Sequence, residues 1–361
     1  MLFTRLRGVL HIYSAFPRFF RFSKANFVKR NSSSHQLSQV AMATKHTMVL
    51  DTDVGVDDAV ALLMALSQPR VDLIGVTCVH GNTSLDNVMV NTLRVLKVGN
   101  RLEIPVFKGA SSPLIGQDAT GDSHYHHGND GMGGVPDPDP PSRDLIQSEH
   151  AVNALIRLAN EHPGEISLVA IGPLTNLALA TKMDPEFSKN LKELVIMGGN
   201  VEGRGNKWPG AEYNFRMDPE AAQIVLHEYQ CNIMIMPLES CRNNALTWEF
   251  HDKWLSTDTV KGRFLHDILK HATHHSRVIR KKPLSIICDA SAMAVAVDRS
   301  MITDMIKAHV TIELNGQNTR GQMVQVNTGW RDVLPGEGRE VDIVLKYDKD
   351  VMMNMLMKTV E

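Results

Sequence analysis

Residues 49–66, VLDTDVGVDDAVALLMAL, connect an apolar segment that predicts a buried strand to a second apolar segment that predicts a helix. The same alternation recurs after residue 46, as in VDLIGVTCV before SLDNVMVNTLRVLKVG and EISLVAIG before LTNLALATKM. Apolar strands that alternate with amphipathic helices are typical of a parallel sheet covered on both faces. We therefore expect an α/β fold, namely a doubly wound, mostly parallel, Rossmann-like sheet with helices on both faces.

The N-terminal segment differs in composition from the rest of the chain. Residues 1–50 contain eight Lys or Arg and no Asp or Glu, and the remainder contains 30 basic and 40 acidic residues. An arginine-rich, acid-free segment predicts a mitochondrial presequence, with a disordered basic tail or a start at Met42 as alternatives. We expect residues 1–41 to be a targeting-like or disordered segment and residues 46–361 to form a single domain. The protein would reach the mitochondrial matrix with a working presequence, and the cytosol if it starts near Met42.

Composition also argues against several classes of protein. The body of the chain is mildly acidic and lacks a Lys and Arg cluster, so we expect no nucleic-acid partner. The longest apolar run, at 59–66, is eight residues long, whereas a helix that spans a membrane needs about 20. The four cysteines are far apart and lack zinc-site spacing, so neither a zinc site nor a disulfide framework is expected. They are Cys78, Cys231, Cys241 and Cys288.

Two long polar connections interrupt the alternation of strands and helices. They cover residues 116–143 and 198–217, and both are rich in Gly. Loops longer than about 12 to 15 residues are uncommon in compact domains unless they build a site or act as lids. We expect both connections to contribute to a site, although the first could also be a solvated insertion.

Four aspartates, Asp51, Asp53, Asp57 and Asp58, are crowded where the first strand gives way to the first helix. A helix N-terminus favours nearby negative charge by only ~0.3 to 1 kcal/mol. Two like charges ~4 Å apart repel each other by about 4 kcal/mol at an effective dielectric constant of 20. A bound cation resolves this imbalance, and oxygen ligands favour Ca²⁺ or Mg²⁺ over zinc.

Three kinds of site could use such a cluster. An EF-hand loop that starts at Asp51 would need an acidic residue where Leu62 stands, so we discard it. A phosphatase with an aspartyl nucleophile would also need a phosphate-binding Lys and a later acidic pair, which we cannot place. The third possibility is a metal cage whose free positions hold the vicinal hydroxyls of a substrate and an activated water.

The same stretch resembles the N-terminal signature of the inosine-uridine-preferring nucleoside hydrolase family, D-x-D-x-G-x-D-D-A. The resemblance covers nearly all of residues 47–345 and implies hydrolysis of the N-glycosidic bond of ribonucleosides to free base and ribose. It also implies a homo-oligomer, either a dimer or a tetramer. The further motifs follow in the family's order: VHGN, HGNDGMGG, AIGPLTNLA, VIMGGN, AEYNFRMDPEAA and CDASAMAVAVD.

The resemblance also implies a Ca²⁺ cofactor and a general base. Its ligands would be Asp53, Asp58, Asp289 and the main-chain carbonyl of Thr175. Asp53 would in addition take a proton from the Ca²⁺-bound water, which is the nucleophile.

The resemblance places the ribose beside this metal. Asp57, Asn82 and Asn214 would hold the sugar, together with Asp289. Carboxylate and amide oxygens there would stabilise an oxocarbenium-like transition state, so Asn214 is a candidate catalytic residue. The 5′-hydroxyl end would meet Asn206, Glu212 and the backbone near Met197.

Two other aspartates have simpler interpretations. Asp218 precedes Pro219 and an apolar helix, which indicates a helix N-cap. Asp51 either supports the metal cage from outside or only ties the strand end to the helix.

Cys288 departs from the family pattern. In the best-known branch a histidine stands there and protonates the departing base. A thiol is a poorer proton donor near neutral pH, so protonation must be shared with other groups or reach the base through water. This departure leaves base preference open and motivates an alternative function, a non-catalytic nucleoside or ribose sensor. The candidate donors are His124, Tyr125, His126, His127, Trp208, His271, His274, His275 and Arg277.

Overall fold

The computed structural model describes residues 45–116, 124–206, 208–326 and 339–361. The expectations for residues 1–41 lie outside this part of the chain, and the domain boundary near residue 46 stays a prediction. Among the described residues, no helix is both long and apolar enough to cross a membrane.

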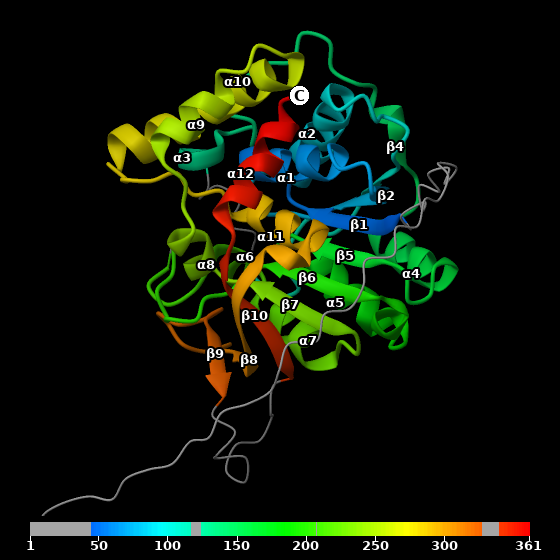
Figure 1. Ribbon diagram of the computed structural model, residues 1–361. Helices are drawn as coiled ribbons and strands as arrows, with labels where there is room; N and C mark the ends of the chain where they lie inside the picture. Colours follow the sequence, from blue (N-terminus) through cyan, green and yellow to red (C-terminus); the bar gives the residue numbers. More distant parts are fainter. Residues whose placement is uncertain (1–44, 117–123, 207, 327–338) are drawn as a thin grey trace, which may run out of the picture. The chain divides into compact units, whose positions relative to one another are not determined.

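Ten strands of the described chain form one sheet, in the order β4-β3-β2-β1-β5-β6-β7-β10-β8-β9 (Figure 1). Every pair from β4 to β10 in this order is parallel, and the two last pairs, β10 with β8 and β8 with β9, are antiparallel. The expected mostly parallel sheet is therefore confirmed. The strands are β1 (His46–Thr52), β2 (Val71–Cys78), β3 (Val106–Lys108), β4 (Ile146–Gln147), β5 (Ser167–Ala170), β6 (Glu193–Met197), β7 (Asn232–Met236), β8 (Ile302–Ile312), β9 (Met323–Val326) and β10 (Glu340–Tyr347).

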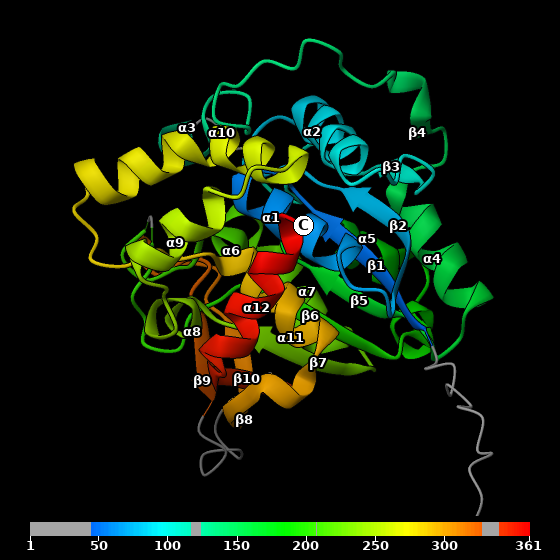
Figure 2. The same ribbon diagram turned by 45° about the horizontal axis from the view of Figure 1, so that its top comes forward.

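Helices cover both faces of the sheet, as expected (Figures 1 and 2). Side chains of β1 alternate between two apolar cores: Met48 and Leu50 pack with α1, α2, α11 and α12, and Val49 packs with α4, α5 and α7. The helices are α1 (Val56–Leu66), α2 (Leu85–Val98), α3 (His124–His127), α4 (Ala151–Glu161), α5 (Thr175–Met183), α6 (Tyr213–Met217), α7 (Pro219–Glu228), α8 (Leu238–Asn243), α9 (Trp248–Leu255), α10 (Val260–His274), α11 (Cys288–Val297) and α12 (Lys349–Thr359).

The order of the strands reverses at β1. The chain runs from β1 through β2, β3 and β4 toward one edge, and then returns to the other side of β1 with β5. In parallel sheets of this kind, ligands bind outside the carboxyl ends of the strands at such a reversal point. The loops that follow β1, β2, β5 and β6 meet there, and they carry most of the polar residues that the sequence singled out.

Two predictions about secondary structure need correction. The polar connection expected through Met217 ends earlier, because Glu212 caps a short helix, α6, by accepting hydrogen bonds from the N–H groups of Asn214 and Phe215. The first connection contains another short helix, α3. The sequence-based prediction did not include the antiparallel pairs of β10 with β8 and of β8 with β9.

Candidate active site

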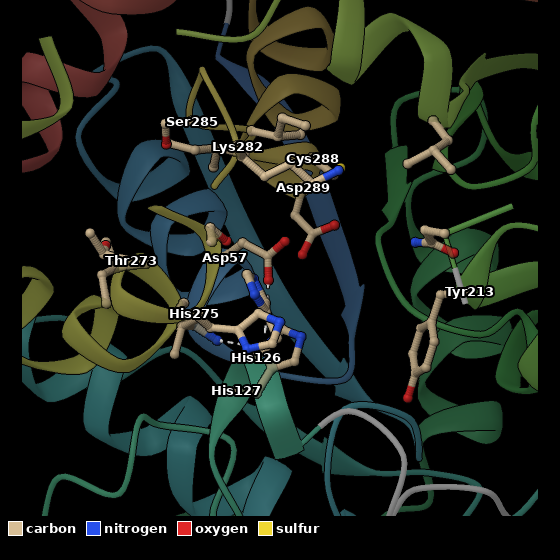
Figure 3. Close-up of a pocket in the computed structure, with 18 of the residues that line it drawn as sticks. Asp57, His126, His127, Tyr213, Thr273, His275, Lys282, Ser285, Cys288 and Asp289 are labelled. Atoms are coloured by element: carbon tan, nitrogen blue, oxygen red, sulfur yellow. Dashed lines mark hydrogen bonds and ion pairs between the residues drawn. The ribbon is translucent and has the colours of Figure 1, made fainter. Parts of the chain in front are cut away.

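A cavity of about 560 Å³ opens at the carboxyl ends of the central strands (Figure 3). Its floor comes from the loops after β1, β2, β5 and β6, and its outer wall comes from α3, α8, α9, α10 and the segment that precedes α11. The predicted residues that line it are Asp57, Asn82, Met197, Asn206, Glu212, Asn214, Cys288 and Asp289.

Three acidic side chains converge at the bottom of this cavity. One carboxylate oxygen each of Asp57, Asp58 and Asp289 lies within 4.8 Å of the others. Asp57 and Asp58 stand in the first turn of α1, and Asp289 stands in the first turn of α11. This acidic group thus contains Asp57 in place of Asp53, the ligand expected from the resemblance.

Asp53 lies directly beside this group. Its Oδ2 accepts a hydrogen bond of 2.8 Å from the N–H of Asn82, and the negative charge of Asp58 adds to burial in raising its pKa. Within the described ranges, Oδ1 of Asp53 and Oδ1 of Asp57 are buried and have no hydrogen-bond partner. A buried carboxylate oxygen without a donor is costly, so both atoms are available to a cation or to a substrate.

Asp58 is the most firmly held of the four. Its Oδ1 accepts 2.6 Å from the hydroxyl of Thr52, and its Oδ2 accepts 2.9 Å from the N–H of Gly55 and 2.9 Å from Nδ2 of Asn82. The contact with Gly55 satisfies a free N–H at the start of α1. Asn82 therefore positions two carboxylates as well as lining the cavity.

Burial makes Asp53, Asp58 and Asp289 resist ionisation. It raises the pKa of Asp58 above its usual value and the pKa values of Asp53 and Asp289 well above theirs, and the neighbouring carboxylates add to the effect. Like charges at these separations each disfavour the other's ionised form. A divalent cation bound between these carboxylates would offset the cost of burying their charge and the repulsion between them. These residues therefore fit a metal site.

Thr175 begins α5 and belongs to a buried hydrogen-bond network. Its hydroxyl donates 2.6 Å to Asp218 Oδ2 and lies 3.0 Å from Nε2 of His80. Asp218 also accepts 3.0 Å from the N–H of Ala221 and precedes Pro219, so its predicted role as the N-cap of α7 is confirmed. The use of the Thr175 carbonyl as a metal ligand stays a prediction.

Asp51 lies behind the cavity and does not line it. Its Oδ2 accepts 2.6 Å from Thr77 and 2.8 Å from Asn176, so it ties β1 to β2 and to α5. Burial raises the pKa of Asp51 to about 7. These contacts favour the interpretation in which Asp51 ties the strand end to its neighbours.

Glu212 lines the cavity and also holds the backbone around it, while its predicted contact with the 5′-hydroxyl end stays a prediction. Its carboxylate accepts from the N–H groups of Gly199, Asn214 and Phe215 at 2.9 to 3.1 Å, and burial raises its pKa to about 7. Nδ2 of Asn214 in turn donates 3.1 Å to the carbonyl of Met197. Glu212 and Asn214 therefore hold the loops after β6 in place, whether or not they also meet a substrate.

Comparison with known proteins decides the family. A model of inosine-uridine preferring nucleoside hydrolases matches residues 48–354. The chain belongs to the inosine-uridine preferring nucleoside hydrolase family. An inosine-uridine preferring nucleoside hydrolase of Leishmania major is 34% identical over 306 residues, which are 84% of this chain and 94% of the relative. A probable uridine nucleosidase 2 of Arabidopsis thaliana is 36% identical over 232 residues, covering 64% of this chain and 70% of the relative.

Solved structures agree with this assignment. A plant nucleoside hydrolase superimposes with a TM-score of 0.81 at 30% identity, covering 87% of this chain and 98% of that chain. The protein is therefore an enzyme of ribonucleoside hydrolysis with the α/β fold of its family.

The outer wall of this nucleoside hydrolase holds four of the nine candidate proton donors: Tyr125, His126, His127 and His275 line the cavity. The other five do not line it in the part of the chain that the structure describes. His271 instead lies 3.1 Å from the carbonyl of Tyr125. The remaining four are His124, Trp208, His274 and Arg277.

Cys288 lines the cavity beside Asp289 (Figure 3). Its pKa is raised well above the usual value, first by the hydrogen bond with Cys241 and then by burial. The thiol therefore stays protonated and holds its proton tightly.

Several further cavity residues of this nucleoside hydrolase escaped sequence reasoning. Tyr213, which donates 2.9 Å to the carbonyl of Gly81, directly precedes the predicted Asn214 and could have been found from that position. α8 follows β7 but belongs to no motif quoted above, and α9 and the segment after α10 follow no strand of the parallel sheet. Residues on these three segments therefore gave no signal. They include Arg242, Trp248, His251 and Lys282.

Proposed function

We propose that this nucleoside hydrolase is Ca²⁺-dependent and uses Asp53 as its general base. The side chains of Asp53, Asp58 and Asp289 and the carbonyl of Thr175 would hold the ion. The observation that carries the proposal is the cluster of buried carboxylates, which needs a cation and offers only oxygen ligands.

The ion, when bound, supplies a Lewis acid that lowers the pKa of water. Asp53 then accepts the proton of the attacking water, for which its buried and unpartnered Oδ1 is suited. Asp57, Asn82 and Asn214 orient the ribose, with Asp289. Their oxygens would lower the barrier by stabilising the positive charge that develops on the sugar as the glycosidic bond breaks.

Residues of the outer wall act on the departing base. We propose that Tyr125, His126 and His275 share its protonation, directly or through water, because they line the cavity and can donate a proton. Cys288 contributes less, since its thiol holds its proton tightly. Asn206 and the backbone near Met197 would meet the 5′-hydroxyl end.

The test is a panel of inosine, uridine, cytidine and guanosine, assayed for ribose release with Ca²⁺ and with EGTA, on protein that starts at Met42. We expect release that EGTA abolishes and that Asp53→Ala lowers by ~10²-fold or more. Asp86→Ala, which changes an exposed acid on α2, is the matched control and should leave release unchanged. Folded protein that releases no ribose from any of the four would overturn the proposal.

The same assay separates the enzyme from a nucleoside sensor on this fold. A sensor would bind ribonucleosides in the presence of Ca²⁺ but turn them over no faster than Asp53→Ala. The intact set of Asp53, Asp58, Asn214 and Asp289 supports the enzyme.

The choice between Asp53 and Asp57 as the metal ligand needs its own measurement. We expect Ca²⁺ affinity, measured by calorimetry, to fall more in Asp53→Asn than in Asp57→Asn. The opposite order would exchange the two roles and agree with the group that Asp57 forms with Asp58 and Asp289.

We also propose that residues 1–41 direct the protein to the mitochondrial matrix and that the enzyme is a homo-oligomer. The basic, acid-free composition of the segment supports the first proposal. Fusion of residues 1–45 to a fluorescent protein tests it, and light scattering on the purified enzyme tests the second. Diffuse cytosolic fluorescence or a monomeric mass would refute the respective proposal.

A further inference from the structure

The loop after β6 carries Asn206 to the cavity but has little structure of its own. Residues 201–206 form neither helix nor strand, and they include Gly203, which has a φ of +66°, and Gly205. Glycine leaves the unfolded backbone more freedom than other residues do, so ordering such a loop is costly. The loop therefore needs contacts from outside to keep one conformation, and α8 supplies them.

Glu239, in the first turn of α8, holds the start of this loop. One oxygen of its carboxylate accepts 2.9 Å from the N–H of Val201, and the other accepts 3.1 Å from the N–H of Glu202. The side chain of Glu239 is buried, and hydrogen bonds to a carboxylate are stronger than those between neutral groups. These two bonds fix the first two residues of the loop.

Arg242, in the last turn of α8, holds the other end of the loop. Its Nη1 donates 3.3 Å to the carbonyl of Arg204, and its Nη2 donates 3.1 Å to the carbonyl of Gly205. The planar fork of a guanidinium suits two neighbouring acceptors in this way. Gly205 directly precedes Asn206, which lines the cavity. Arg242 therefore fixes the backbone from which Asn206 reaches the cavity.

α8 can hold the loop because it is itself bound to the sheet. It packs against β10 (Figure 1). The hydroxyl of Ser240 donates to the carbonyl of Val344, and Nδ2 of Asn244 donates 3.4 Å to the carbonyl of Leu345. The end of the loop that carries Asn206 is thus connected through α8 to a strand of the sheet.

We propose that Arg242 is a positioning residue, which fixes Asn206 where that side chain can bind the 5′-hydroxyl of the ribonucleoside. This rests on the proposed function, in which Asn206 meets the 5′-hydroxyl end. A shift of about 1 Å in a group that positions a substrate can cost ~10²-fold in rate. Through Asn206, Arg242 therefore makes the enzyme favour ribonucleosides that carry a free 5′-hydroxyl.

The experiment compares the ribonucleoside of the panel that wild type hydrolyses fastest with its 5′-deoxy analogue, by steady-state release of the base. The variants are Arg242→Gln, Asn206→Ala and the two combined. Asn243→Ser changes the exposed neighbour of Arg242 on α8 and is the matched control. Hydrogen–deuterium exchange of residues 200–206 in each protein reports on the loop without any substrate.

We expect Arg242→Gln to lower kcat/KM for the ribonucleoside at least about ten-fold and for the 5′-deoxy analogue less than about two-fold. Because Arg242 acts through Asn206, the combined variant should be no slower than Asn206→Ala. Exchange of residues 200–206 should be faster in Arg242→Gln than in wild type and in Asn243→Ser.

Three results would overturn the proposal for Arg242: equal losses for the two substrates, additive losses in the combined variant, or unchanged exchange in Arg242→Gln. Failure of the proposed function looks different. Exchange would then be faster in Arg242→Gln as expected, but wild type would release no base from any nucleoside of the panel.

Discussion

Cys288 lies in the cavity wall where its proton is hard to release, since Cys241 and burial both raise its pKa. A general acid typically contributes ~10² to 10⁴-fold to a rate. Because other donors line the cavity, we expect Cys288→Ala to lower kcat for inosine by less than about ten-fold. Steady-state kinetics at neutral pH measure this. A loss of a hundred-fold or more would show that the thiol is the main acid.

The position of a residue in the candidate site was predictable from the sequence where a motif sets both the residue type and its position relative to a strand end. Asp53, Asp57 and Asp58 lie in the cavity region because they are placed between the end of β1 and the first turn of α1, at the carboxyl edge of the sheet. The hydrogen bonds of Glu212 could not be foreseen. They depend on how the chain folds back after β6 to bring the N–H of Gly199 within 3.0 Å, and no local pattern encodes that approach.

The loop after α3 packs against α10 at one glycine. Gly133 has a φ of +71°, and a Cβ there would lie 2.4 Å from the carbonyl oxygen of Ile268; Gly134 has a φ of +73° and open space around it. Alanine at either position should lose roughly 1 to 2 kcal/mol of stability from its left-handed backbone. Gly133→Ala should lose a further ~1 to 3 kcal/mol from overpacking. It should also lower kcat/KM, because the N–H of Gly133 donates 2.8 Å to the carbonyl of His127, which lines the cavity.

Chemical unfolding and uridine hydrolysis of both variants measure these effects. Gly134→Ala controls for the backbone conformation, since the two positions differ mainly in the space around the new methyl group. Equal losses in the two variants would mean that the contact with α10 does not position the loop.

Asp218 caps α7 and connects it to two other segments. Its carboxylate accepts from Ala221, Thr175 and Leu114. Asp218→Ala removes a helix cap worth ~1 kcal/mol and leaves two further donors without a partner at ~1 to 3 kcal/mol each, so we expect a loss of at least about 3 kcal/mol in urea unfolding.

The exposed cap of α12 is the matched comparison. Among the residues that the structure describes, Asp348 accepts only from N–H groups of its own helix, so Asp348→Ala should lose about 1 kcal/mol. A loss as large as that of Asp218→Ala would refute the claim that the buried network adds stability beyond the cap.

Helices and strands of the parallel region were predictable because each one is a continuous apolar run or has a clear helical period. The last three strands were not. β8 is mostly half-exposed and includes Asp304 and Lys307, so its sequence lacks such a run. α9 and α10, which form the outer wall, belong to no strand–helix unit. Their place over the cavity follows from packing between segments that are distant in sequence.

At the scale of the whole molecule, we expect the effect of metal removal on the stability of the folded protein to depend on pH. Burial raises the pKa values of Asp53, Asp58 and Asp289, and brings those of Asp51 and Glu212 to about 7. The metal-free native state therefore keeps protons that the unfolded chain has released. The contribution of these five acids to stability is therefore fully present below the unfolded pKa of about 4 and is lost as the pH rises toward the raised native values.

Ca²⁺ should replace the protons of its proposed ligands Asp53, Asp58 and Asp289 as the pH rises. At 100 times its Kd a ligand adds about 2.7 kcal/mol, so we expect Ca²⁺ to raise Tm by roughly 5 to 10 °C relative to EGTA at about pH 8. The difference should be much smaller at about pH 5.5, where protons compete for the carboxylates. Thermal unfolding followed by fluorescence measures it. A Tm difference that grows toward acid pH would contradict this account.

β1 contributes side chains to both apolar cores, because Met48 and Leu50 pack in one core and Val49 packs in the other. Opening β1 locally would expose both cores at once, at a free energy close to that of complete unfolding. The amide hydrogens of β1 should thus be among the slowest in the molecule to exchange with deuterium. The aspartates that follow this strand, for which we propose a role in catalysis, would then be anchored to one of the segments that open least often.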